Sequence, residues 1–142
     1  MERIMQGKMV VAGSGQGQAL VSRDPLSFWG GYDYHNGEII DRRHPLSGHI
    51  AAGRVLALPF TRGSSTTTAV LLEAVKAGTA PAAIITTGPD RFFALASIVA
   101  DEMYGTPIPL VALSEADFAV LETGQWVEVR EDGEVTVSDE VR

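Results

Sequence analysis

The chain is organised around one segment, Leu56-Ala57-Leu58-Pro59-Phe60-Thr61-Arg62-Gly63-Ser64-Ser65-Thr66-Thr67-Thr68-Ala69-Val70. An apolar run ends at a proline, a turn containing glycine follows, and five consecutive hydroxyl residues lead into a helical pattern at residues 69–76. This order predicts a strand, a turn and a helix N-terminus. The first N–H groups of a helix have no partner within the helix and carry partial positive charge, so such a turn is suited to hold an anionic group.

Two interpretations of the hydroxyl run remain open at this level. Ser and Thr are favoured N-caps because their side-chain oxygens accept hydrogen bonds from the first N–H groups of a helix, although one such residue would suffice. The alternative is a site in which Ser64 and Ser65 handle a carboxylate or an abstracted proton. A P-loop is excluded, because no Gly-Lys-Ser/Thr sequence is present and Arg62 precedes the glycine.

The composition favours a globular protein of one domain, residues 1–142. Hydrophobic residues make up 45% and charged residues 20% of the 142 positions, which is enough to build one core. A net charge of −7 argues against nucleic acid as a partner, since phosphate binding needs a basic surface. Nine of the eleven cationic residues are Arg, a residue type suited to bidentate carboxylate contacts, although Arg richness also follows genome composition.

Several kinds of site are excluded or disfavoured. The chain contains no cysteine, so it cannot form a disulfide or hold an iron–sulfur cluster by thiolates. Its histidines, at positions 35, 44 and 49, are not at metal-ligand spacings, so we expect no metal site within this chain. No segment has the length and apolarity of a membrane span or a signal peptide, and we expect a cytoplasmic protein with no membrane contact.

The pattern of apolar and turn residues predicts a mixed α/β domain of hairpins around a β-α-β-α-β unit. A hairpin is expected from residues 8–12 and 18–22, joined by the glycine-rich residues 13–17, and a helix is expected to start at Asp90. The inner face of that helix is predicted to consist of Phe92, Leu95, Ala96, Val99, Ala100 and Met103. Further strands are expected at residues 54–58, 81–87 and 109–113, with a short helix after Ser114 and a closing hairpin of residues 126–130 and 134–137.

Residues 24–49 are rich in turn residues but also carry aromatic and charged side chains. Asn36-Gly37 predicts a hairpin between Tyr34 and Ile39. The run at residues 41–44, Asp-Arg-Arg-His, is open to two readings: contact with a substrate carboxylate or a partner, or solvated charge beside a turn.

Five motifs in order resemble one known family. They are residues 25–31 (PLSFWGG), 40–46 (IDRRHPL), 53–56 (GRVL), 62–66 (RGSST) and 78–83 (GTAPAA). Together they resemble the swivel domain, or small subunit, of aconitase X, over roughly residues 8–129.

The resemblance implies a swivelling β/β/α fold and a hydro-lyase completed by a large catalytic subunit, which carries the iron or iron–sulfur group; no cofactor is implied for this chain. It implies that Ser64 is the base that removes the proton alpha to the substrate carboxylate, and that Arg62, Gly63, Ser65 and Thr66 bind the substrate. Aconitases proper carry an arginine at the position of Thr66, so a different activation of Ser64 is implied here.

The resemblance leaves the hydroxy-acid substrate open between two dehydrations. Cis-3-hydroxy-L-proline, giving a pyrroline-2-carboxylate, is favoured over phosphomevalonate, because no Lys or Arg cluster is clearly dedicated to a phosphate. A non-catalytic module that holds an anion or regulates another protein is the alternative from a different class.

Overall fold

The computed structural model describes residues 2–28, 30–61 and 66–139. Arg62, Gly63, Ser64, Ser65 and Trp29 therefore lie outside the described residues. The described part contains ten strands and three helices: β1 Glu2–Gln6, β2 Lys8–Val11, β3 Gly15–Val21, β4 Tyr32–Asp33, β5 Glu38–Ile39, β6 Val55–Ala57, α1 Thr66–Ala77, β7 Ala83–Thr86, α2 Arg91–Tyr104, β8 Leu110–Ala112, α3 Glu115–Ala119, β9 Trp126–Val129 and β10 Glu134–Ser138.

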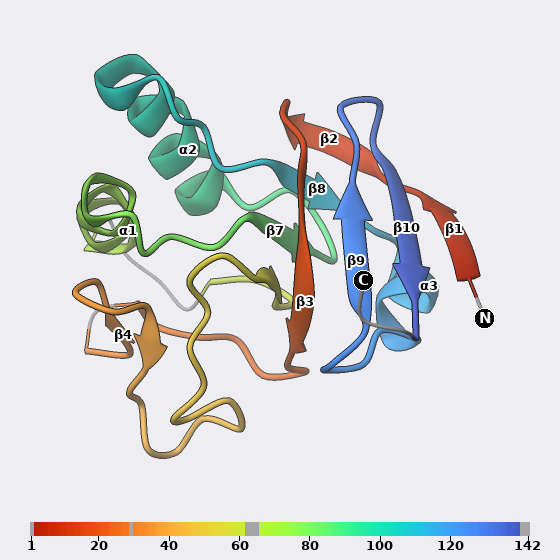
Figure 1. Ribbon diagram of the computed structural model, residues 1–142, viewed down its shortest axis with the longest axis horizontal. Coiled ribbons are helices and arrows are strands. Elements are labelled where there is room, and N and C mark those ends of the chain that lie inside the picture. Colours follow the sequence, from red (N-terminus) through yellow and green to blue (C-terminus); the bar gives the residue numbers. More distant parts are fainter. Residues whose placement is uncertain (1, 29, 62–65, 140–142) are drawn as a thin grey trace.

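Eight strands form a sheet that curls into a nearly closed barrel (Figure 1). Its order is β1-β10-β9-β3-β6-β7-β8-β2, so the two edge strands, β1 and β2, are neighbours along the chain. They are joined at Gly7, whose N–H donates to the carbonyl of Gly133 (2.9 Å). One bent strand therefore lies along both edges of the sheet and brings them together.

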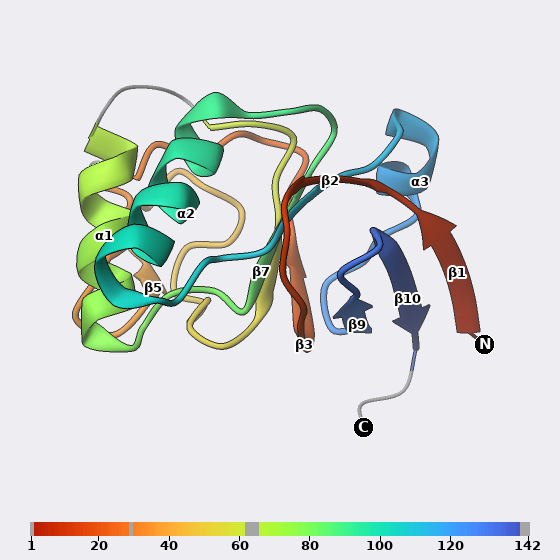
Figure 2. The same cartoon turned by 90° about the horizontal axis from the view of Figure 1, so that it is seen from above.

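The parallel part of the sheet consists of β3, β6, β7 and β8. The short strands β6, β7 and β8 are buried throughout, as expected when side chains are covered on both faces. α1 and α2 pack against each other on one side, whereas α3 lies on the other side with β1, β9 and β10 (Figure 2). Two hydrophobic clusters result, one under α1 and α2 around Leu56 and Phe93, the other around Val111, Phe118 and Val127.

The predicted hairpin of residues 8–12 and 18–22 is wrong. β2 pairs with β8, whereas β3 lies between β9 and β6. The glycines read as a turn belong partly to β3, where they allow close approach: a Cβ on Gly17 would lie 2.7 Å from the carbonyl oxygen of Gly53. The glycine pattern reflects crowding between neighbouring chain segments rather than a reversal of direction.

The predicted inner face of α2 is only partly confirmed, since Ala96 and Ala100 are buried but the other predicted positions are half-buried or exposed. The buried residues are Phe93, Ala96, Ser97 and Ala100, whereas Leu95 is 50% and Met103 60% exposed. Ser97 is buried because its hydroxyl donates to the carbonyl of Ile108 and accepts that residue's N–H (2.8 Å). Ser97 thus occupies a core position because its polar group has a buried partner. The spacing of apolar side chains predicts neighbouring residues at the core instead.

The remaining predicted elements are confirmed within a few residues. The Asn36-Gly37 hairpin joins β4 and β5, with Gly37 at a φ of 82°. Asp90 and Ser114 cap α2 and α3, and β9 and β10 form the closing hairpin. None of the helices in the described part of the chain is long and apolar enough to cross a lipid bilayer.

Candidate active site

The candidate site lies where the parallel strands end. β3, β6 and β7 run in the same direction and end at Val21, Ala57 and Thr86. The segments that follow them therefore meet at one edge of the sheet, which is where sheets of this kind bind ligands. The segment after β6 leads through Thr61 towards Ser64.

Only part of the predicted site can be placed. Arg62, Gly63, Ser64 and Ser65 fall outside the described residues. Thr66 is half-buried and is the first residue of α1, which begins three residues earlier than the apolar pattern indicates. The helix that the sequence predicts after the hydroxyl run is therefore confirmed, with Thr66 as its first described residue.

The threonines of the hydroxyl run differ in their surroundings. Thr67 is 1% exposed and faces the core. The hydroxyl oxygen of Thr68 is buried as well and has no hydrogen-bond partner within the described part of the chain. Packing in the core therefore explains the presence of at least one of these hydroxyl residues. The candidates for binding a substrate are then the residues at the start of the run.

Asp90 holds the segment before the candidate loop. Its Oδ2 accepts the N–H of Thr61 (2.7 Å) and the Thr61 hydroxyl (2.9 Å). Its Oδ1 accepts the N–H groups of Phe92 (3.0 Å) and Phe93 (3.1 Å) at the start of α2. Both Asp90 and Thr61 are buried, at 8% and 7% exposed.

Sequence reasoning found Asp90 only as a helix cap. Thr61 and Asp90 are 29 positions apart, with α1 and β7 between them, and no local spacing signals a contact over this distance. Thr61 also forms an isolated parallel bridge with Leu26, so it lies between two segments distant in sequence. A local signal that could have placed Asp90 here is its position as a polar residue shortly after the buried strand β7 and next to Pro89.

The charged run at residues 41–44 lies at the lower edge of the molecule in Figure 1. His44 is buried; its Nδ1 accepts the N–H of Leu46 (3.1 Å), so its Nε2 carries the proton and donates to the carbonyl of Asp24 (3.2 Å). This pairing fixes a neutral tautomer and makes His44 a structural residue.

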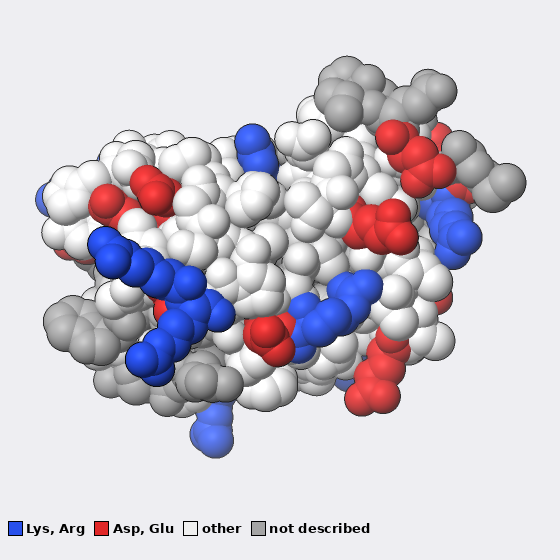
Figure 3. Space-filling view, turned by 90° about the horizontal axis from the view of Figure 1, so that it is seen from below, with Lys and Arg blue, Asp and Glu red and all other residues white. Residues whose placement is uncertain are grey.

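The arginines of that run face solvent. Arg42 and Arg43 are exposed, and Arg43 lines a hollow of about 480 Å³ that Asp24 and Asp41 also line. Figure 3, seen from below Figure 1, shows Lys and Arg side chains gathered on this face with a few Asp and Glu between them. Because carboxylates share the hollow with the guanidinium, it is not a dedicated anion site.

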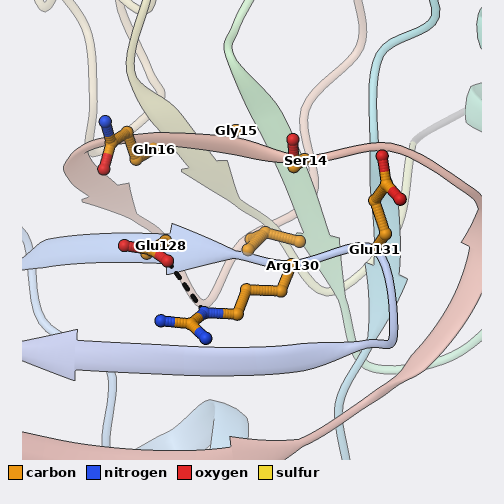
Figure 4. Close-up of a pocket in the computed structure, with 7 residues that line it drawn as sticks. Ser14, Gly15, Gln16, Glu128, Arg130 and Glu131 are labelled. Carbon is orange, nitrogen blue, oxygen red and sulfur yellow. Dashed lines mark hydrogen bonds and ion pairs between the residues drawn. The ribbon is translucent and has the colours of Figure 1, made fainter.

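A larger hollow, of about 560 Å³, lies at the opposite end of the parallel strands, where β3 begins (Figure 4). Ser14 and Gln16 at the start of β3 line it, with Glu128 and Arg130 from the closing hairpin. Arg130 Nε donates to Glu128 (2.8 Å), and this contact raises the pKa of the guanidinium. Arg130 and Glu128 therefore neutralise each other, and Glu131 adds a further carboxylate to the lining of this hollow.

No metal centre is formed by the described ranges 2–28, 30–61 and 66–139. They contain no group of three or more His, Asp or Glu side chains that could hold a metal ion. His35, one of the three histidines, pairs instead with Asp33 (3.0 Å), and this contact lowers the pKa of that carboxyl group.

Comparison with known proteins gives consistent matches. The family model described as the aconitase X swivel domain matches residues 4–137. A solved structure of Thermococcus kodakaraensis aconitase X, in its holo-form, superposes with a TM-score of 0.84 and 34% identity, over 95% of this chain and 98% of that one. This superposition confirms the swivelling β/β/α fold class.

Two kinds of curated relative are similar in sequence. The cis-3-hydroxy-L-proline dehydratase of Pseudomonas aeruginosa is 49% identical over 108 residues, which is 76% of this chain and 19% of the relative. The phosphomevalonate dehydratase small subunit of Methanothermobacter thermautotrophicus is 38% identical over 126 residues, 88% of this chain and 92% of the relative. The chain thus spans about a fifth of the first relative's length and nearly all of the second.

Proposed function

The chain belongs to the aconitase X swivel domain family, and from this membership we propose that it is the small subunit of a two-subunit dehydratase acting on a hydroxy acid. The observation that carries the proposal is the family match over residues 4–137, joined to a helix N-terminus at Thr66 at the carboxyl edge of the parallel strands. The partner is a large aconitase X catalytic subunit.

We propose cis-3-hydroxy-L-proline as the substrate. The support is the higher identity to a protein named for that dehydration, 49% against 38%. Phosphomevalonate is the second candidate, favoured by a different observation: the relatives named for it are small chains of which this chain covers 92% and 98%.

Ser64 is the proposed base, and it removes the proton alpha to the substrate carboxylate. A serine hydroxyl is a weak base unless its alkoxide is stabilised, and the partial positive charge at the start of α1 supplies part of that stabilisation. Arg62 supplies positive charge, and Gly63, Ser65 and Thr66 hold the substrate. These roles are carried over from the matching RGSST motif.

The iron or iron–sulfur group belongs to the large subunit in this proposal. The described residues of this chain do not fit such a group, and the sequence has no cysteine. The role of this chain is therefore to close the site and to handle the proton.

The first test is an activity assay of this chain co-expressed with a large subunit, offered cis-3-hydroxy-L-proline and phosphomevalonate in parallel. We expect turnover of cis-3-hydroxy-L-proline. Turnover of phosphomevalonate alone would contradict this assignment and make phosphomevalonate the substrate.

Ser64→Ala should lower kcat by about 10²–10⁴-fold, the usual contribution of a general base, while substrate binding is retained. Unchanged kcat would remove Ser64 from the mechanism, and Ser65→Ala is the matched control that separates the two serines.

The purified chain alone should not dehydrate either substrate. The reason is that the proposed site is completed by the other subunit. Product formation, measured by absorbance with and without the large subunit, tests this expectation. Dehydration by this chain alone would contradict the two-subunit proposal, and a stable complex that binds substrate without turnover would favour the non-catalytic, anion-binding alternative.

A further inference from the structure

The two oxygens of the Asp90 carboxylate serve different elements. Oδ1 caps α2 through the N–H groups of Phe92 and Phe93, while the two short contacts of Thr61, from its N–H (2.7 Å) and its hydroxyl (2.9 Å), go to Oδ2. The longer contact between the Thr61 hydroxyl and Oδ1 (3.2 Å) is secondary. One buried side chain thus joins the end of the β6 segment to the start of α2.

These hydrogen bonds are strong enough to fix the backbone at Thr61. Hydrogen bonds to an ionised acceptor are shorter and roughly twice as strong as neutral ones, and burial at 8% exposed strengthens them further. Thr61 is held from the other side by its bridge to Leu26. The chain therefore leaves a fixed point, Thr61, and meets a second one at α1, whose first residue is Thr66.

We propose that Asp90 is a positioning residue for the dehydration: acting through Thr61, it fixes the point from which the chain runs to Ser64. This inference rests on the proposed function, in which Ser64 is the base. Its physical basis is that a catalytic group displaced by about 1 Å loses on the order of 100-fold in rate. Asp90 does not touch the substrate.

Asp90→Asn separates the two tasks of this side chain. Asn is as good an N-cap as Asp, so its amide oxygen can replace Oδ1 at Phe92 and Phe93. Its NH₂ group takes the place of Oδ2, so the N–H of Thr61 loses its acceptor, while the Thr61 hydroxyl can turn and accept from the NH₂ group. The cap of α2 is kept, and the hydrogen bond to the Thr61 backbone is lost.

In the two-subunit complex we expect Asp90→Asn to lower kcat by about 10–100-fold, with KM changed by less than about 3-fold. Thr61→Val removes only the hydroxyl contact and should have a smaller effect. The double variant should be no slower than Asp90→Asn alone, because both changes remove one connection. A purely structural role would lower stability and the yield of complex without this separation of kcat from KM.

Ser114→Ala is the matched control. It removes the N-cap of α3, where the Ser114 hydroxyl accepts the N–H of Asp117 (3.1 Å), and has no contact with Thr61. We expect it to lower the midpoint of thermal unfolding and to leave kcat unchanged. A fall in kcat as large as that of Asp90→Asn would show that a general loss of stability explains the effect and would overturn the proposal.

Amide hydrogen exchange on the full chain gives a readout independent of activity. In Asp90→Asn the amide of Thr61 should exchange at least about 10-fold faster, while that of Phe93 keeps its protection. Unchanged exchange at Thr61 would show that Asp90 does not fix the backbone of Thr61. Faster exchange with unchanged kcat would show that Asp90 has no positioning role in catalysis. A wild-type complex without turnover would contradict the proposed function instead, and the exchange result would then decide by itself whether Asp90 fixes Thr61.

Discussion

Tyr32 shows at the scale of one residue how the segment between β3 and β6 is attached to the core. It is 3% exposed, stacks on Phe28 with 5.2 Å between ring centroids, and donates its hydroxyl to the carbonyl of Thr79 (2.7 Å). Burial raises the pKa of the Tyr32 phenol above its ordinary value of 10. The folded state therefore holds this proton more tightly than the unfolded state.

The sign of the pH dependence follows from that shift. The contribution of Tyr32 to stability is complete below about pH 10, where both states are protonated, and is lost as the pH rises beyond the unfolded value. Tyr32→Phe should cost about 1–2 kcal/mol at neutral pH, because the half-buried carbonyl of Thr79 loses a donor, and should remove this part of the alkaline loss. Urea unfolding between neutral and alkaline pH measures both effects.

Tyr104 provides the control, since it is 39% exposed on the last turn of α2. Tyr104→Phe should be as stable as the wild type at neutral pH and should lose stability at alkaline pH as the wild type does. If Tyr32→Phe left the alkaline loss unchanged, the assigned cause would be wrong.

At the scale of one element, α2 shows that an apolar period does not decide which face is buried. Phe93 packs edge-on against Phe28, with 5.4 Å between ring centroids, whereas Leu95 and Ile98 are 50% and 52% exposed. Packing against α1 selects the face with small residues, because Ala96 and Ala100 allow the two helices to approach closely.

Phe93→Ala should therefore lower the free energy of unfolding by about 3–5 kcal/mol, the cost of a cavity at a buried aromatic residue. Leu95→Ala should lower it by less than about 1 kcal/mol, because half of that side chain is already exposed. Equilibrium denaturation of the two variants compares them directly. Equal losses would restore the inner face that the sequence predicts.

For the whole molecule, the decisive feature is the bent strand that brings the two edges of the sheet together. A Cβ on Gly7 would lie 2.5 Å from Cγ2 of the buried Val111 and 3.1 Å from the carbonyl oxygen of Ala112. The backbone passes so close to β8 here that only glycine fits. Crowding at this one position is therefore tied to the closure of the barrel.

Gly7→Ala should destabilise the protein by about 1–3 kcal/mol, the usual cost of an added methyl group in a packed core. Gly88→Ala is the matched control, because a Cβ at Gly88 meets no atom within 4 Å. Thermal unfolding of both variants measures the difference. A Gly7→Ala protein as stable as the control would show that the closure tolerates a side chain.

The sequence by itself determined the elements whose signals are local. The strand β6, the helix α1, the caps at Asp90 and Ser114 and two of the predicted hairpins follow from residues a few positions apart, and the structure confirms them. The predicted turn at Gly63 lies outside the described residues. The motifs also determined the family and fold class, which the comparisons confirm. The roles of Arg62, Gly63, Ser64, Ser65 and Thr66 remain predictions.

The tertiary structure alone decided what depends on distant segments. It separated β2 from β3, turned α2 by its packing on α1, and joined Asp90 to Thr61 across 29 residues. Local patterns encode backbone preference and the period of burial, which act within a few residues. Strand partners, the buried side of a helix and the second task of a capping carboxylate depend on free energy gained only when the whole sheet has closed, so no short stretch of sequence carries them.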